Sequence, residues 1–210
     1  MSISEKLITI AENEQRVYEK GKQAECDAFW DVLQVKGGAP EYNYGFYGGK
    51  WKDTIYNPKY GFNNIHSMAY CFSWTGITDT KKPISFSTSP INLNLLFDNA
   101  NYLKTIRTLT VNENVKYTGW FNNCKKLENI TFAGIIANTI AFSTSPLLTK
   151  VSILSIFSCL SDATGGTTLT LNTTAVNNAF ETASGMADGS TSEEWLNLVA
   201  TKPNWTISLS

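Results

Sequence analysis

The sequence predicts a protein of the α/β class, built as a short, irregular solenoid with a long N-terminal helix and an α/β cap at its C-terminus. Three observations support this prediction. The stretch ISFSTSP at residues 84–90 returns as IAFSTSP at 140–146, phenylalanines recur at positions 72, 97 and 121, and residues 1–36 follow a heptad pattern. Internal repetition at a period of 20 to 50 residues is the sequence signature of stacked repeat architectures.

The charge balance and hydropathy of the chain narrow the classes of function that the protein can have. The chain has 210 residues, with 17 Lys and Arg against 18 Asp and Glu, giving a formal charge of −1. This balance does not favour a nucleic-acid partner or an anionic membrane surface. No apolar run approaches the ~18 residues that span a bilayer, so we expect no membrane insertion. The first 15 residues lack the basic and apolar regions of a signal peptide, which predicts synthesis in the bacterial cytoplasm without export by that route.

Residue types that carry chemistry are sparse. His66 is the one histidine, and the four cysteines Cys26, Cys71, Cys124 and Cys159 are far apart in the sequence, without metal-binding spacing. We therefore expect reduced, buried structural thiols, no metal and no cofactor. No nucleophile–base motif or phosphate-binding loop is present, and the scattered carboxylates do not point to a glycosidase pair. The sequence predicts a protein that is not an enzyme and has no catalytic residues.

Residues 1–36 predict one helix with an apolar seam. Positions 3, 7, 10, 14, 17, 21, 24 and 28 follow 4–3 spacing and are apolar except for Glu14 and Gly21. One interpretation is a coiled-coil stalk that joins two or three copies or anchors the chain. The other is an amphipathic helix packed on its own domain. In the first interpretation the residues that mediate oligomerisation are Ile3, Leu7, Ile10, Val17 and Ala24.

Residues 37–64 are rich in aromatic side chains and glycine. Exposed tyrosine and tryptophan rings would suit stacking on a sugar or docking on a protein. The favoured alternative is that the rings are buried as a cap and neck under the helix, because the end of a solenoid has to be covered. The candidate binding residues in this segment are Tyr42, Tyr44, Tyr47 and Trp51.

Residues 65–147 contain the repeat. Aligned on the three phenylalanines, successive units read F-x-x-A/C-x-x-L-x-x-I, so that Ala100 matches Cys124 and Ile106 matches Ile130. This spacing is typical of leucine-rich-repeat-like units, whose apolar sides are buried only when neighbours stack. Polar residues of the strand faces and loops are candidate ligand contacts: Asn99, Asn101, Arg107, Asn122 and Asn123.

Both FSTSP stretches predict a strand that turns into a helix. Ile84 and Ile140 begin apolar alternation, and Ser89 and Ser145 precede a proline, as helix N-caps do. After the second copy, residues 147–162 predict an amphipathic helix.

Residues 148–210 predict the C-terminal cap. Strands are expected at 168–171 and 205–209, with a helix around Val176 between them. A last helix before Pro203 should begin at one of two capping boxes, Ser190 with Glu193 or Thr191 with Glu194.

The repeat units resemble the divergent leucine-rich repeats of BspA-type surface proteins. The whole chain resembles a group of prophage tail-associated proteins of Firmicutes. Its more specific parts are the opening KLITIAENEQRVYEKGKQAECDAFWD and the closing TLTLNTTAVNNAFETASGMADGSTSEEWLNLVATKPNWTISL.

This resemblance implies a non-catalytic phage tail or baseplate-associated protein, present in the virion, that presents a repeat domain for host-surface recognition or attachment. Its partners would be tail or baseplate proteins, a host cell-surface protein or glycan, and further copies of itself. The alternative is a bacterial leucine-rich-repeat adhesion or protein-interaction module without a phage role. A third possibility is an inert structural decoration. These assignments associate fold with function.

Overall fold

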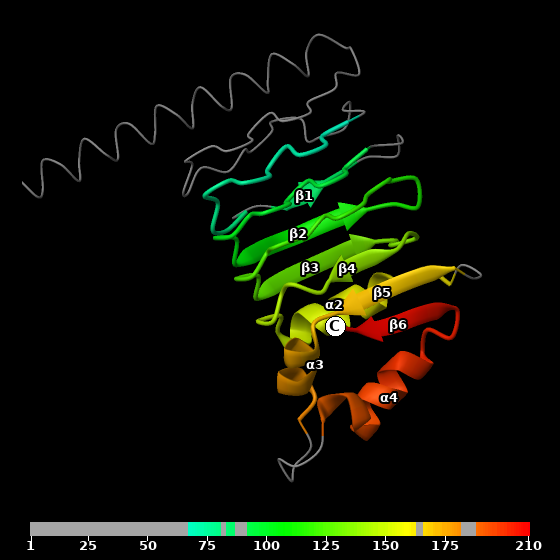
Figure 1. Cartoon of the computed structure of the whole chain (residues 1–210). Coiled ribbons are helices and arrows are strands. Elements are labelled where there is room, and N and C mark those ends of the chain that lie inside the picture. Colours follow the sequence, from blue (N-terminus) through cyan, green and yellow to red (C-terminus); the bar gives the residue numbers. More distant parts are fainter. Residues whose placement is uncertain (1–66, 81–82, 87–91, 163–165, 182–187) are drawn as a thin grey trace, which may run out of the picture.

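The structure is a computed structural model, and it describes residues 67–80, 83–86, 92–162, 166–181 and 188–210. This part of the chain is mixed α/β and contains two three-stranded parallel sheets, seen one after the other in Figure 1. The first sheet has the order β1-β2-β3 and consists of Ile84–Ser85, Thr105–Val111 and Asn129–Gly134. The second has the order β4-β5-β6 and consists of Ile140–Phe142, Thr167–Leu171 and Trp205–Leu209. The predicted N-terminal helix and aromatic segment lie outside the described residues.

Apolar alternation places the strands of the first sheet against the core. In β3, Ile130 and Phe132 are buried while their neighbours face outward. In β2 the alternation is broken, because Ile106 and Leu109 are both buried and a register shift lies between them. A bulge of this kind inserts a residue and re-aims the side chains around it. The extra residue lets Leu109 return to the core, while Arg107, next to Ile106, is exposed on the outer side of the sheet as alternation requires.

Successive chain segments are stacked in register, and we call them rungs: 67–80, 92–105 and 116–129. Backbone hydrogen bonds join equivalent positions of neighbouring rungs, from Phe72 N to the Leu96 carbonyl at 2.8 Å and from Phe97 N to the Trp120 carbonyl at 3.2 Å. Ile106 pairs with Ile130, and Ala100 and Cys124 are fully buried. The alignment of the repeat units made from the sequence is therefore confirmed, and each unit makes a turn at its phenylalanine.

One aromatic column passes through all the rungs. The rings of Phe72 and Phe97 are stacked with centroids 5.5 Å apart, and those of Phe97 and Phe121 are stacked at 5.9 Å. Phe121 then stacks on Phe142 of β4 at 4.6 Å. Each of these rings is at most 4 % exposed. The column therefore makes the apolar core continuous from the first rung into the second sheet.

Helix α2 (Lys150–Cys159) covers the free edge of β3. The Ser152 hydroxyl accepts a hydrogen bond from Ile130 N at 2.9 Å and donates one to the Glu128 carbonyl at 3.0 Å. The Ser155 hydroxyl accepts from Phe132 N at 2.8 Å. An uncovered strand edge invites pairing with other chains, and here helix hydroxyl groups replace the missing strand.

The predicted start of this helix was wrong. The N-cap of α2 is Thr149, whose side chain accepts from Ser152 N. Ser145 is fully buried instead, and its hydroxyl donates to the Cys124 carbonyl at 3.1 Å. The hydroxyl is thus used to join the chain to the preceding rung, so it does not cap a helix. Ser89 lies outside the described residues.

The C-terminal part follows the predicted order of elements, with β5 and β6 at the expected positions. Helix α3 (Thr173–Ala179) lies between these strands and buries Val176. The N-cap of helix α4 (Glu193–Ala200) lies one or two residues after the predicted caps: it is Ser192, which accepts from Trp195 N at 3.2 Å. Ser190 and Thr191 belong to a separate short helix, η1 (Gly189–Thr191), capped by Asp188. Within the described ranges, no helix has the length and apolar character needed to cross a membrane.

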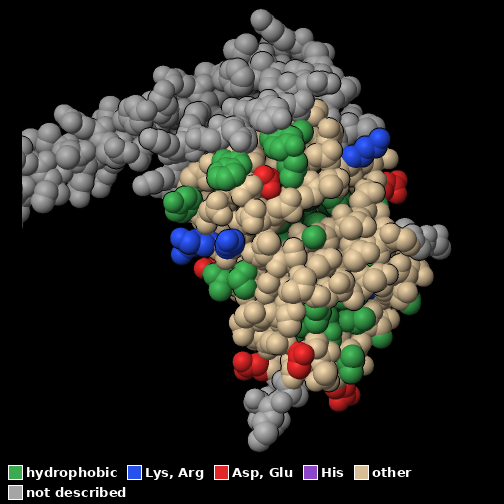
Figure 2. Space-filling model, viewed as in Figure 1, with side chains coloured by type: hydrophobic (Ala, Val, Ile, Leu, Met, Phe, Trp, Pro, Cys, Tyr) green, Lys and Arg blue, Asp and Glu red, His purple; other side chains and the backbone are tan. Residues whose placement is uncertain are grey.

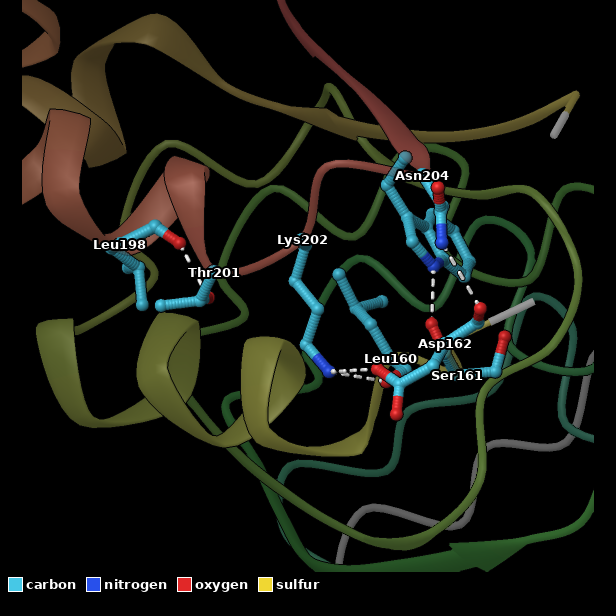
Figure 3. A network of polar contacts seen from close by, with 8 residues as sticks. Leu160, Ser161, Asp162, Leu198, Thr201, Lys202 and Asn204 are labelled. Carbon is cyan, nitrogen blue, oxygen red and sulfur yellow. Dashed lines mark hydrogen bonds and ion pairs between the residues drawn. The ribbon is translucent and has the colours of Figure 1, made fainter. Parts of the chain in front are cut away.

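Hydrogen bonds from Lys202, Asn204 and Trp205 join the start of β6 to residues 160–162, which follow α2, and we call this set of contacts the latch (Figure 3). The Lys202 ammonium lies 3.4 Å from the Asp162 carboxylate, and its side chain is only 15 % exposed. The hydrogen bonds run from Lys202 Nζ to the Leu160 carbonyl at 2.6 Å, from Asn204 Nδ2 to the Asp162 carbonyl at 3.1 Å, and from Trp205 Nε1 to the Ser161 carbonyl at 2.8 Å. The cation therefore sits at the C-terminus of α2, where the helix dipole favours positive charge.

Candidate functional site

The candidate site is the outer surface of the turns that precede β2 and β3, together with the equivalent turn of the first rung. We call it the turn face and define it by Trp74, Asp98, Asn99, Asn101, Tyr102, Asn123 and Lys126. Along the left edge of Figure 2, where Figure 1 places the turns before β2 and β3, hydrophobic, basic and acidic side chains lie close together. This surface mixes side-chain types that could contact a ligand.

Each turn is shaped by two residues with positive φ, four positions apart. The first of each pair is Tyr70, Leu95 or Gly119, and the second is Trp74, Asn99 or Asn123, with φ between 56° and 61°. Asparagine and glycine are the residues that adopt this region most readily. The two asparagines therefore satisfy a backbone requirement and at the same time present a side-chain amide at the surface.

The amides form a ladder across neighbouring rungs. Asn123 Nδ2 donates to Asn99 Oδ1 at 3.0 Å, and Asn99 Nδ2 donates to Asp98 Oδ2 at 2.7 Å. The Ser73 hydroxyl of the first rung donates to the Asp98 carbonyl at 2.7 Å. The sequence marked Asn99 and Asn123 as separate polar positions. The structure brings them into direct contact and fixes their orientation.

The same turns carry two exposed aromatic residues. Trp74 and Tyr102 are 53 % and 57 % exposed, which is unusual for such large residues. Lys126 Nζ lies 5.1 Å from the centroid of the Tyr102 ring, within the range of a cation–π contact. Neither residue was among the contact residues predicted from the sequence. Trp74 could have been found, because it stands two residues after Phe72, as Asn99 follows Phe97 and Asn123 follows Phe121.

The other predicted contact residues fall in different settings. Asn101 belongs to the same turn, and its Nδ2 donates to the Asn99 carbonyl at 3.1 Å. Asn122 is exposed, and its carbonyl accepts from Asn99 N at 2.8 Å. Arg107 lies on β2 and makes a two-point ion pair with Asp79 of the preceding rung, at 2.6 Å and 3.1 Å. Its guanidinium therefore joins β2 to the first rung and is not a free contact group. The following candidates lie outside the described residues: Tyr42, Tyr44, Tyr47, Trp51, Ile3, Leu7, Ile10, Val17 and Ala24.

The described thiols have structural settings. Cys71, Cys124 and Cys159 are reduced and buried, as predicted, and Cys26 lies outside the described residues. Burial raises the pKa of Cys124 to about 12, and its Sγ donates to the Phe97 carbonyl at 3.1 Å. Burial also raises the pKa of the Tyr117 hydroxyl well above its usual range. Both groups therefore stay protonated at neutral pH and are poor nucleophiles.

The part of the chain that the structure describes contains no group of three or more His, Cys, Asp or Glu residues placed to hold a metal ion. In comparisons with known proteins, no family model, curated protein or solved structure matches the chain. The turn face is therefore the structural feature from which a function can be inferred.

Proposed function

We propose that this chain is a non-catalytic attachment protein of a phage tail or baseplate that presents a repeat domain to the host surface. The observation that carries the proposal is the turn face, where a ladder of amides and two exposed rings are held by the backbone of stacked rungs. Side chains fixed in this way lose little conformational entropy when they bind a partner. Such a surface suits recognition rather than chemistry.

We further propose that the rungs form a short solenoid of leucine-rich-repeat type. Its support is the in-register bonding of segments that are 23 to 25 residues apart, such as Met68 N to the Asn92 carbonyl and Leu93 N to the Lys116 carbonyl, at 2.8 Å and 2.7 Å. The usual period of leucine-rich repeats is 20–29 residues. A solenoid offers a broad surface built from equivalent positions, which is how this architecture engages partners.

The assignment to a tail rests on the resemblance of the two ends of the chain to prophage tail-associated proteins. The runner-up is a bacterial leucine-rich-repeat adhesion module without a phage role, which the same turn face would serve equally well. The two are separated by locating the protein. Antibodies against the chain are applied to particles purified after prophage induction of a strain that carries the gene. Presence on tails supports the first proposal, whereas presence on cells and absence from particles supports the second.

Attachment is tested with the labelled full chain on whole bacteria and on isolated cell walls. We expect saturable binding that unlabelled protein displaces. Absence of binding to every strain that the corresponding phage infects would contradict the attachment proposal.

Oligomerisation is tested separately by light scattering. In the full chain, we expect Leu7→Glu to convert a dimer or trimer to a monomer, because it replaces an apolar seam residue by a second charge beside Glu14. A wild-type monomer would instead support the helix packed on its own domain.

A further inference from the structure

We propose that the turn face binds a neutral glycan, with sugar rings lying on Trp74 and Tyr102 and sugar hydroxyls bonded to the asparagine amides. This inference rests on the proposed attachment function and names the ligand class for it. The apolar C–H face of a pyranose needs an exposed aromatic ring, and its hydroxyls need polar partners nearby. The turn face supplies both within three consecutive rungs.

Trp74 is the first argument. It has φ of 59° at the position where the next two rungs have asparagine, and its side chain is 53 % exposed. A bulky residue in this region of φ is strained, and an exposed ring gains little from burial. Tyr70 and Leu95 have similar φ values, but both residues are half-buried, unlike Trp74. Residues with strained backbone conformations are often kept at functional sites. We therefore infer that the Trp74 ring contacts a ligand.

The hydrogen-bonding capacity of the amides is the second argument. Asn99 uses both ends of its amide, donating to Asp98 and accepting from Asn123. Asn123 and Asn101 each use the amide nitrogen, and among the described residues nothing donates to their side-chain oxygens. These two oxygens are therefore available as acceptors for hydroxyl groups. The ladder holds them in place before the ligand arrives.

Charge is the third argument, and it favours a neutral ligand over an anionic wall polymer. The same turns carry the bases Lys104, Lys125 and Lys126, but also the acids Asp98 and Glu128. Three bases against two acids leave a net charge of only +1 on these turns, too small an excess to attract an anionic polymer strongly. A peptide ligand would gain most from an apolar groove or an open strand edge, whereas the turn face offers rings and amides.

The decisive variant is Trp74→Asn in the full chain. It installs the residue that the other two rungs have at this position, so we expect the melting temperature to be unchanged or raised. The loss of the ring should weaken glycan binding by about tenfold or more. Tyr102→Ala should have a similar effect. Val151→Ala is the matched control, because Val151 is 72 % exposed on α2 and should leave binding unchanged.

Binding is measured on an array of neutral oligosaccharides, anionic polysaccharides and teichoic acid, and in parallel on whole cells. Neutral-glycan binding that is lost in Trp74→Asn and retained in Val151→Ala would support the inference. Array binding only to anionic polymers, or neutral-glycan binding that Trp74→Asn leaves intact, would overturn it. Absence of any array binding by the wild type would also overturn it, whereas cell binding by the same protein would keep the attachment function. Array binding without cell binding would overturn attachment and retain the glycan site.

Discussion

The rungs between residues 67 and 134 and the C-terminal part from 150 to 210 are held together in different ways. In the rungs the same contacts recur: equivalent backbone groups bond, equivalent phenylalanines stack, and equivalent turn residues have positive φ. In the C-terminal part, contacts made by particular side chains have no counterpart in the rungs, such as the Ser152 and Ser155 hydroxyls at the β3 edge and the bond from Lys202 to the Leu160 carbonyl. Repeated contacts therefore hold the rungs to one another, whereas particular side chains close the edge at which the first sheet ends.

Removing a ring from the column should have the largest effect. Phe121 is 1 % exposed and stacks on both Phe97 and Phe142, so Phe121→Ala opens a cavity between the rungs and the second sheet. We expect the free energy of unfolding to fall by about 3–5 kcal/mol, measured by chemical denaturation. Val151→Ala should change it by less than about 0.5 kcal/mol. A loss below about 1 kcal/mol in Phe121→Ala would show that the column does not hold the rungs together.

The hydroxyl that ends the first sheet should come next. Ser152→Ala leaves the Ile130 N–H without its hydroxyl partner and removes one of two hydrogen bonds from the Glu128 carbonyl, which also accepts from Thr149 N at 2.9 Å. This should cost about 2 kcal/mol. Amide hydrogen exchange at Ile130 should accelerate in the same variant. Ser158→Ala is the control, since Ser158 is exposed and bonds only within α2 and to its neighbour Cys159. Equal effects of the two substitutions would contradict the role assigned to Ser152.

The latch should contribute less. Lys202→Met removes the hydrogen bond to the Leu160 carbonyl and should lower the free energy of unfolding by about 1 kcal/mol. Asp162→Asn should have no measurable effect, because the Asp162 side chain is 95 % exposed and solvent screens its charge. A larger loss in Asp162→Asn than in Lys202→Met would indicate that the ion pair, rather than the carbonyl contact, fastens β6.

The smallest loss in the free energy of unfolding is expected for a substitution that follows the repeat pattern. Cys124 matches Ala100 of the preceding rung, so Cys124→Ala should cost under about 1 kcal/mol at pH 7. The folded thiol has a pKa of about 12, against an ordinary value of 9.0. Above pH 9 the unfolded chain therefore loses this proton while the folded chain keeps it, and stability falls as pH rises towards 12. The melting temperature should drop less between pH 7 and pH 10 in the variant than in the wild type. An equal drop would show that another group causes the alkaline loss.

Part of the site could be predicted from the sequence, and part could not. Polarity and loop position led to Asn99 and Asn123, because asparagine in a turn is both exposed and suited to positive φ. Arg107 was selected by the same polarity, but its guanidinium is paired with the Asp79 carboxylate of the first rung at 2.6 Å. Trp74 was missed because a lone aromatic in sequence looks like a core residue. Its exposure depends on how the first rung stacks on the next one, where Trp74 N bonds to the Asp98 carbonyl at 3.0 Å.

The sequence by itself determined the repeat unit, since apolar spacing decides which side chains each rung must bury. The phenylalanine column and the pairing of Ile106 with Ile130 follow from that spacing. Only the tertiary structure decided the fate of the two FSTSP stretches, whose similar beginnings enter different sheets, Ile84 in β1 and Ile140 in β4. Local sequence specifies a strand, but the sheet it joins depends on which neighbouring edge is still unpaired. Ser145 likewise bonds the Cys124 carbonyl because the stacked rung places that acceptor within reach.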